Sequence, residues 1–229
     1  MLNISEPFTL ERKYFSMICE AACREDCEKM AVMLEQEMQR IMDFFGLKEL
    51  SRNLMIYMTS SREVYKAHME KIAGQNEAIQ YFDWMIADTY DNDINLLSLE
   101  ACHEIEMHKE FDEEEYRKLI VHEFVHICHR HCFCRTVTWD KFCVWFWEAL
   151  ATVLSGQNYP DIRIECTPEQ LLTQFPDIPD SYTIANNIGK YMLKTLSHEK
   201  ILHYIYQPED LANDLAGILE QMKKIPGSM

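Results

Sequence analysis

The chain has 229 residues, of which 48% are hydrophobic and 26% are charged. This composition is typical of a folded domain and excludes a disordered chain. Its formal net charge of −16 at pH 7 disfavours a nucleic-acid-binding surface, which needs clustered lysine and arginine.

No apolar run reaches the roughly 18 residues that cross a bilayer. The first residues also lack the basic and then apolar pattern of an export signal. The nine cysteines are an odd number, and several fall within helical patterns, which favours free thiols in a reducing compartment. We therefore expect a cytoplasmic protein that binds neither membrane nor nucleic acid.

Residues 9–45 are predicted to form one long helix or two, because methionine, leucine and isoleucine recur at helical spacing with few helix breakers. Within this stretch Cys19, Cys23 and Cys27 are four residues apart and would share one helical stripe. Three such thiols could bind a metal ion, but buried cysteine is an ordinary small core residue. We favour the core interpretation.

The next stretch predicts a small mixed sheet. The apolar run at 54–58 is bounded by polar residues and predicts a strand, after which Ser60 or Ser61 caps a helix. Residues 83–88 and 93–99 predict two further strands, joined by a turn-rich segment as in a hairpin. We expect the strand at 93–99 to lie at the edge of the sheet, where an extended peptide can pair with it.

From about residue 105 the chain is predicted to be essentially helical. Asp112 is a suitable N-cap, and the glutamates at 113–115 favour the positive end of a helix that extends at least to Cys128. A strongly apolar helix follows at 142–154 and ends near Gly156. Later helices are predicted to start near Thr167, Ser181, Ser197 and Pro208.

These elements predict an α+β fold. A lobe with a small mixed sheet and helices covers about residues 1–105, and a mainly helical lobe covers about residues 106–229. The length suits a single domain spanning residues 1–229.

The helix that Asp112 starts contains the sequence His-Glu-Phe-Val-His, with histidines at 122 and 126 and a glutamate at 123. At helical spacing His122 and His126 are one turn apart on one face, where both can bind one metal ion. Glu123 lies beside that face and can take a proton from a metal-bound water. This is the minimum apparatus of a zinc-dependent hydrolase.

A tetrahedral zinc ion needs a further protein ligand and an open position for water. Glu148 is the strongest candidate, because it is an isolated acid in an otherwise apolar helix, where a carboxylate is costly to bury without a partner. Alternatively, Glu148 faces solvent on a half-buried helix.

His129 shares the histidine stripe but lies about 10 Å along the axis from His122, so all three histidines cannot reach one ion. We expect His129 to line a cleft or to be a solvent-exposed cation at the helix end. The neighbouring thiols and imidazoles between Cys128 and Cys134 resemble a metal site by composition, but they lack the second pair of a structural zinc site.

These motifs resemble those of the gluzincin metallopeptidases, in particular the compact peptidase-MA-like domains related to the catalytic domain of zinc aminopeptidases. The resemblance covers roughly residues 50–205. It rests on Val121–His126, on the Trp-Glu-Ala-Leu-Ala motif around Glu148, and on the segment that opens with Tyr182. It implies a zincin-like fold in which the helix bearing both histidines lies at the cleft.

The resemblance also implies that the opening tyrosine of the third segment stabilises the oxyanion. This role falls on Tyr182, with Tyr191 as the alternative. The pattern departs from the family where Ala185 replaces an expected glycine. The Gly-rich strand by which aminopeptidases recognise a free N-terminus is not visible, so exopeptidase activity does not follow.

The leading hypothesis is a zinc metallopeptidase acting on a peptide or protein substrate. One catalytic Zn²⁺ is held by His122, His126 and Glu148, Glu123 is the general base, and Tyr182 stabilises the oxyanion. Two alternatives stay open: a non-catalytic or regulatory zinc-binding relative, and a zinc hydrolase of non-peptide amides or esters. A chance match within an unrelated helical protein is the remaining interpretation.

Overall fold

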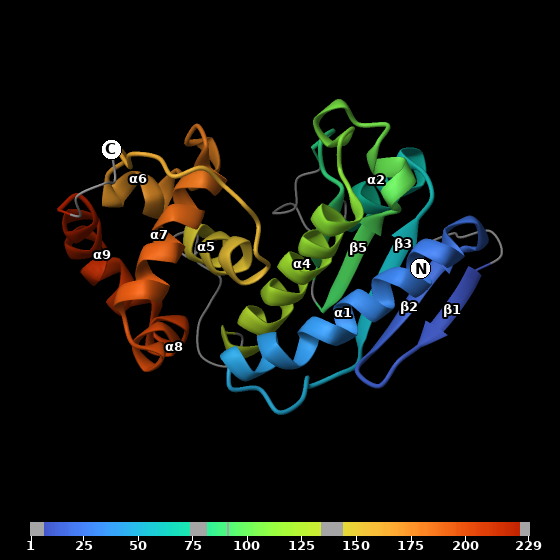
Figure 1. Ribbon diagram of the computed structural model, residues 1–229, viewed down its shortest axis with the longest axis horizontal. Coiled ribbons are helices and arrows are strands. Elements are labelled where there is room, and N and C mark those ends of the chain that lie inside the picture. Colours follow the sequence, from blue (N-terminus) through green and yellow to red (C-terminus); the bar gives the residue numbers. More distant parts are fainter. Residues whose placement is uncertain (1–6, 74–81, 91, 134–143, 225–229) are drawn as a thin grey trace. The chain divides into compact units, whose positions relative to one another are not determined.

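The computed structural model describes residues 7–73, 82–90, 92–133 and 144–224. The chain divides into two compact units, Met1–Ile127 and Cys128–Met229. Figure 1 shows the helices and strands along the chain. The first unit contains a sheet with helices, and the described part of the second is helical. The predicted α+β class is therefore confirmed.

The sheet of the first unit has five strands among the described residues, in the order β1-β2-β3-β5-β4. The central pairs β2–β3 and β3–β5 are parallel, and the outer pairs β1–β2 and β4–β5 are antiparallel. The strands are β1 (Pro7–Glu11), β2 (Phe15–Glu20), β3 (Leu54–Thr59), β4 (Ala87–Tyr90) and β5 (Asp93–Leu97).

The prediction of helix over residues 9–45 is wrong in its first part. The chain forms the hairpin of β1 and β2, and the α-helix α1 begins only at Arg24 and ends at Phe44. The sequence of β2, Phe-Ser-Met-Ile-Cys-Glu, contains no helix breaker. Its apolar residues could be buried equally well in a helix or in a strand. Pairing with β3 and packing against α1 decide the matter, because the strand then buries Phe15, Met17 and Cys19 completely.

The strand predicted at 54–58 is confirmed by β3, and the hairpin is confirmed by the antiparallel pairing of β4 with β5. The first strand of that hairpin is shifted, however, from 83–88 to Ala87–Tyr90. The edge position expected for the strand at 93–99 is also wrong. β5 pairs with β3 on one side and β4 on the other, so β4 is the outermost described strand on this side of the sheet.

Helices cover both faces of this sheet (Figure 1). The helix α2 (Arg62–Ala73) lies on the face that carries Tyr57, whose ring centroid is 5.9 Å from that of His68. The helix α1 lies on the opposite face, because its Cys27 shares a hydrogen bond with Cys19, the strand partner of Met58. Cys19, Cys23 and Cys27 are all buried, as the core interpretation requires.

Short helical segments and one long helix follow β5. They are α3 (Leu99–Cys102), a 3₁₀ turn at Glu106–His108, and α4 (Glu113–Phe133), which continues past the boundary between the units. The Nη1 atom of Arg117 on α4 is 3.0 Å from a carboxylate oxygen of Glu37 on α1. This pair joins α4 to α1 on the same side of the sheet.

The second unit is built from α5 (Val144–Leu154), α6 (Pro168–Thr173), α7 (Ser181–Thr195), α8 (His198–Tyr206) and α9 (Pro208–Met222). Positions 142 and 143 of the predicted apolar helix lie outside the described residues. Gly156, at φ 76°, ends α5 as predicted, and Thr167 forms a capping box with Gln170. Ser197 caps α8, whereas Ser181 is the first residue of α7 and Asp180 precedes it in the left-handed region.

Two properties are shared by all the described parts of the chain. None of their helices is both long and apolar enough to cross a membrane. None of their cysteines forms a disulfide.

Candidate metal centre

The helix α4 begins as its sequence predicts. The backbone N–H of Glu115 donates to the Asp112 carboxylate over 2.8 Å, which satisfies one of the donors that have no partner within the helix. The acidic first turn lies at the positive end of the helix dipole. The carboxylate of Glu115 accepts from Lys118 over 2.7 Å, so it stabilises the helix start.

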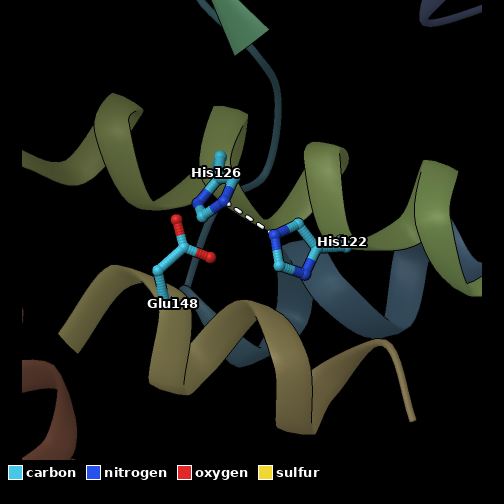
Figure 2. Close-up of side chains that lie close together, drawn as sticks. All are labelled: His122, His126 and Glu148. Carbon is cyan, nitrogen blue, oxygen red and sulfur yellow. Dashed lines mark hydrogen bonds between the residues drawn. The ribbon is translucent and has the colours of Figure 1, made fainter. Parts of the chain in front are cut away.

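The two histidines of the motif lie one turn apart and are both buried, with 6% of His122 and 8% of His126 exposed. Their Nε2 atoms are 3.0 Å apart and their ring planes meet at 87° (Figure 2). The two nitrogens share a hydrogen bond and face one another on one side of the helix, which is the proximity predicted from the sequence.

Glu148 is the only charged residue of α5, whose other members are apolar apart from Thr152. One carboxylate oxygen of Glu148 and one ring nitrogen from each of His122 and His126 lie within 4.8 Å of one another. Figure 2 shows the carboxylate directed toward the two imidazole rings. The described residues contain this one group of three side chains that could hold a metal ion.

The donors of this group suit a zinc-type ion. Two neutral imidazoles and one carboxylate are a common set for catalytic zinc, and three protein ligands leave a position for water. A tetrahedral ion with bonds of about 2.0–2.1 Å to nitrogen separates two imidazole nitrogens by about 3.3 Å. The observed separation of the two histidine nitrogens, 3.0 Å, is close to that value.

Glu123 is buried, with 7% of the residue exposed, and it contacts the edge strand of the sheet. The hydroxyl of Thr89 on β4 donates to Oε2 of Glu123 over 2.6 Å, and it lies 3.3 Å from the backbone carbonyl oxygen of Glu123. The candidate base is thus held at one carboxylate oxygen by a side chain distant in sequence.

A second acid lies close to the candidate base. Burial, and then the negative charge of Glu123, raise the pKa of Asp88 to about 7, while the positive charge of His126 lowers it. One carboxylate oxygen of Asp88 is buried and has no hydrogen-bond partner among the described residues. A bound cation would favour the ionised form of Asp88, because opposite charges stabilise one another at short range.

His129 and the described thiols near the C-terminal end of α4 are buried. His129 is 1% exposed, and its ring lies 5.5 Å from that of Phe146 and 5.3 Å from that of Trp147. The prediction of a solvent-exposed cation at the helix end is therefore wrong, because aromatic rings cover this histidine. Cys128 and Cys132 are buried as well, and Cys134 lies outside the described residues.

The two candidate tyrosines differ in their surroundings. Tyr182 is the second residue of α7, is 37% exposed, and has its ring centroid 6.4 Å from that of Phe175. The hydroxyl of Tyr191 donates to the side chain of Gln221 on α9 over 3.2 Å. Tyr191 is therefore tied to another helix, whereas Tyr182 is partly accessible to a ligand.

Sequence reasoning overlooked Asp88 and Thr89. They were assigned to the end of a strand and to a turn, respectively, and no local pattern distinguishes them from ordinary residues of such segments. Thr89 is 34 residues from Glu123, and only the pairing of β4 beside β5 brings the two together. Had the strand been predicted at Ala87–Tyr90, where the structure has it, Thr89 would have been recognised as a strand residue.

Comparisons of the chain with models of protein families, with curated proteins and with solved structures each returned no match.

Proposed function

We propose that the protein is a zinc-dependent metallopeptidase. The observation that carries the proposal is the convergence of His122, His126 and Glu148, with Glu123 between the two histidines on the same helix. A glutamate in that position is unnecessary for metal binding alone, which favours a hydrolase over a protein that only binds metal. The zincin-like arrangement and the choice of zinc both belong to this proposal.

Each residue of the candidate site has a separate role in the proposed hydrolysis. Zinc, when bound by the three ligands, supplies an activated water and a Lewis acid for the substrate carbonyl. Glu123 accepts the proton of the attacking water and later delivers it to the leaving amine. Tyr182 donates its hydroxyl hydrogen to the carbonyl oxygen as negative charge develops there.

A peptide substrate is favoured by the position of β4. This strand pairs with β5 on one side and ends the sheet on the other within the described residues. An extended peptide can add to such an edge through main-chain hydrogen bonds. Because Thr89 of β4 contacts Glu123, a peptide paired with β4 would pass near the candidate base.

The first prediction concerns Glu123. In Glu123→Gln the base is lost while both histidines and Glu148 remain, so we expect zinc to bind as in the wild type and kcat to fall by about 10²–10⁴. The assay is cleavage of a peptide library by the full chain, with and without 1,10-phenanthroline, followed by zinc readdition. Zinc content is measured by atomic absorption.

The matched control is Glu115→Gln, on the same helix, where the carboxylate pairs with Lys118 near the surface. We expect this variant to cleave peptides at the wild-type rate. Undiminished turnover by Glu123→Gln would contradict the proposal. Zinc binding without hydrolysis of any peptide would favour a non-catalytic zinc-binding protein. Hydrolysis of esters or simple amides alone would favour a zinc hydrolase of non-peptide substrates.

A further inference from the structure

We propose that Thr89 is a positioning residue for Glu123, holding one oxygen of its carboxylate so that the other is presented to the water that is to be deprotonated. This inference deepens the proposed hydrolytic function and depends on it. It assigns part of the catalytic machinery to the edge strand of the sheet, at a position that no helix motif includes.

The contact itself is short and directional. The Thr89 hydroxyl lies 2.6 Å from Oε2 of Glu123 and 3.3 Å from the carbonyl oxygen of the same residue. A hydroxyl has one hydrogen to donate, and the carboxylate oxygen is both nearer and more negative. The hydrogen is therefore directed at Oε2, and a bond to an ionised acceptor is stronger than one between neutral groups.

Strand pairing fixes the side of the sheet from which Thr89 acts. Thr89 pairs with Ile94, and Ile94 pairs with Ile56. Side chains alternate along a strand, so Thr89 lies on the face of Ile56 and Met58, opposite to Tyr57. This is the face that α1 covers, and Arg117 joins α4 to α1. The β-branched side chain of Thr89 has few rotamers, which keeps its hydroxyl in place.

A second hydrogen bond holds α4 on the same side. The hydroxyl of Tyr116 donates to the backbone carbonyl of Leu97 on β5 over 2.5 Å, and Tyr116 is buried. Tyr116 precedes Glu123 by seven residues, which is close to two helical turns, so both residues are on one face of α4. The sheet therefore fixes the rotation of α4 at two levels along its axis.

The shared helix fixes where Glu123 lies relative to the two histidines. At about 100° per residue, His122 is displaced from Glu123 by roughly 100° and His126 by roughly 60°, both in the same direction around the helix. The sheet-facing residue of the motif is thus Glu123. With Oε2 bonded to Thr89, the carboxylate cannot rotate freely about its last torsion, and its second oxygen keeps a fixed direction.

The test compares Thr89→Val with Thr89→Ser in the zinc-loaded full chain. Valine keeps the shape of threonine and removes the donor, whereas serine keeps the donor. We expect Thr89→Val to lower kcat by about 10- to 100-fold, since misplacement of a catalytic group by about 1 Å can cost a factor of 10². KM and zinc content should stay close to wild type, and Thr89→Ser should recover most of kcat.

Thr59→Val is the matched control. Thr59 is a buried threonine of the same sheet, and its hydroxyl bonds to the backbone carbonyl of Leu96, not to Glu123. We expect wild-type kcat from this variant. A Thr89→Val protein with unchanged kcat, or a Thr89→Ser protein as impaired as Thr89→Val, would overturn the proposal.

A readout independent of activity separates this inference from the proposed function. In chelator-treated protein, Thr89→Val, Glu123→Ala and the double variant are compared by urea unfolding. If the two side chains are bonded, the double variant loses less stability than the sum of the single variants. Additive losses would overturn the Thr89 assignment even in an active enzyme. An inactive wild type would contradict the proposed function. Non-additive losses of stability in this double-mutant cycle would still establish the hydrogen bond between Thr89 and Glu123.

Discussion

At the level of single residues, the polar side chains of the candidate site are buried, and burial determines which partners they need. His122, Glu123 and His126 are each less than a tenth exposed, and leaving such groups without a partner is costly. Glu123 has such a partner, because its carboxylate accepts a hydrogen bond from the Thr89 hydroxyl. The sequence predicted the three motif residues from spacing alone, but it gave no sign of Thr89, because the hydrogen bond spans 34 positions.

A buried histidine outside the site leads to a prediction about pH. The Nε2 atom of His68 on α2 lies 2.7 Å from the side-chain oxygen of Asn95 on β5. Burial lowers the pKa of His68, and the Asn95 contact opposes that effect only in part. Because the folded pKa is below the unfolded value near 6.5, the unfolded state binds more protons, and stability falls as pH drops below about 6.5.

In His68→Gln this part of the pH dependence should disappear. The measurement is the free energy of unfolding in urea at several pH values between 8 and 5 in about half-unit steps. His198→Gln, at an exposed position on α8, is the control and should keep the wild-type slope. An unchanged slope in His68→Gln would show that other groups account for the acid sensitivity.

At the scale of elements, helices were predicted better than strands. The start of α4, the end of α5 at Gly156 and the Thr167 capping box all follow from short local patterns. The hairpin of β1 and β2 was mistaken for a helix, because an apolar stretch without breakers suits both. The inner position of β5 was missed as well, since a strand's neighbours depend on the whole sheet.

The contact between α5 and α7 gives a prediction at this scale. A Cβ atom added to Gly189 of α7 would lie 2.7 Å from the backbone oxygen of Ala149 on α5. Backbone cannot yield as a flexible side chain can, so Gly189→Ala should destabilise the protein by about 1–3 kcal/mol through overpacking.

Gly217→Ala is the matched control within the same unit. Gly217 lies inside α9, and a Cβ atom there meets nothing within 4 Å. We expect this variant to gain about 0.5–1 kcal/mol, because alanine is the better helix former. Urea unfolding measures both values. A neutral Gly189→Ala would show that the two helices separate easily.

At the scale of the whole molecule, acidic residues dominate the charge. The 38 aspartates and glutamates exceed the 22 lysines and arginines, which gives −16 at pH 7. Repulsion among like charges destabilises a compact chain. Raising NaCl from about 10 mM to about 100 mM shortens the screening length from roughly 30 Å to roughly 10 Å, and it should raise the thermal midpoint at pH 7.5 by a few degrees.

The same titration near the isoelectric point of about 4.9 is the control. With little net charge to screen, the midpoint should be nearly independent of salt. A midpoint that falls with salt at pH 7.5 would mean that attractive ion pairs, such as Arg117 with Glu37, outweigh the repulsion.

Helical spacing in the sequence was enough to predict the local parts of the candidate site. The sequence predicted the paired histidines, the glutamate between them, the N-cap of their helix and the isolated acid of α5, because each is a relation among residues a few positions apart. Only the tertiary structure decided the sheet order, the edge position of β4 and the hydrogen bond from Thr89 to Glu123. Those features join distant segments, and the free energy of burying both sheet faces selects among pairings that are locally equivalent.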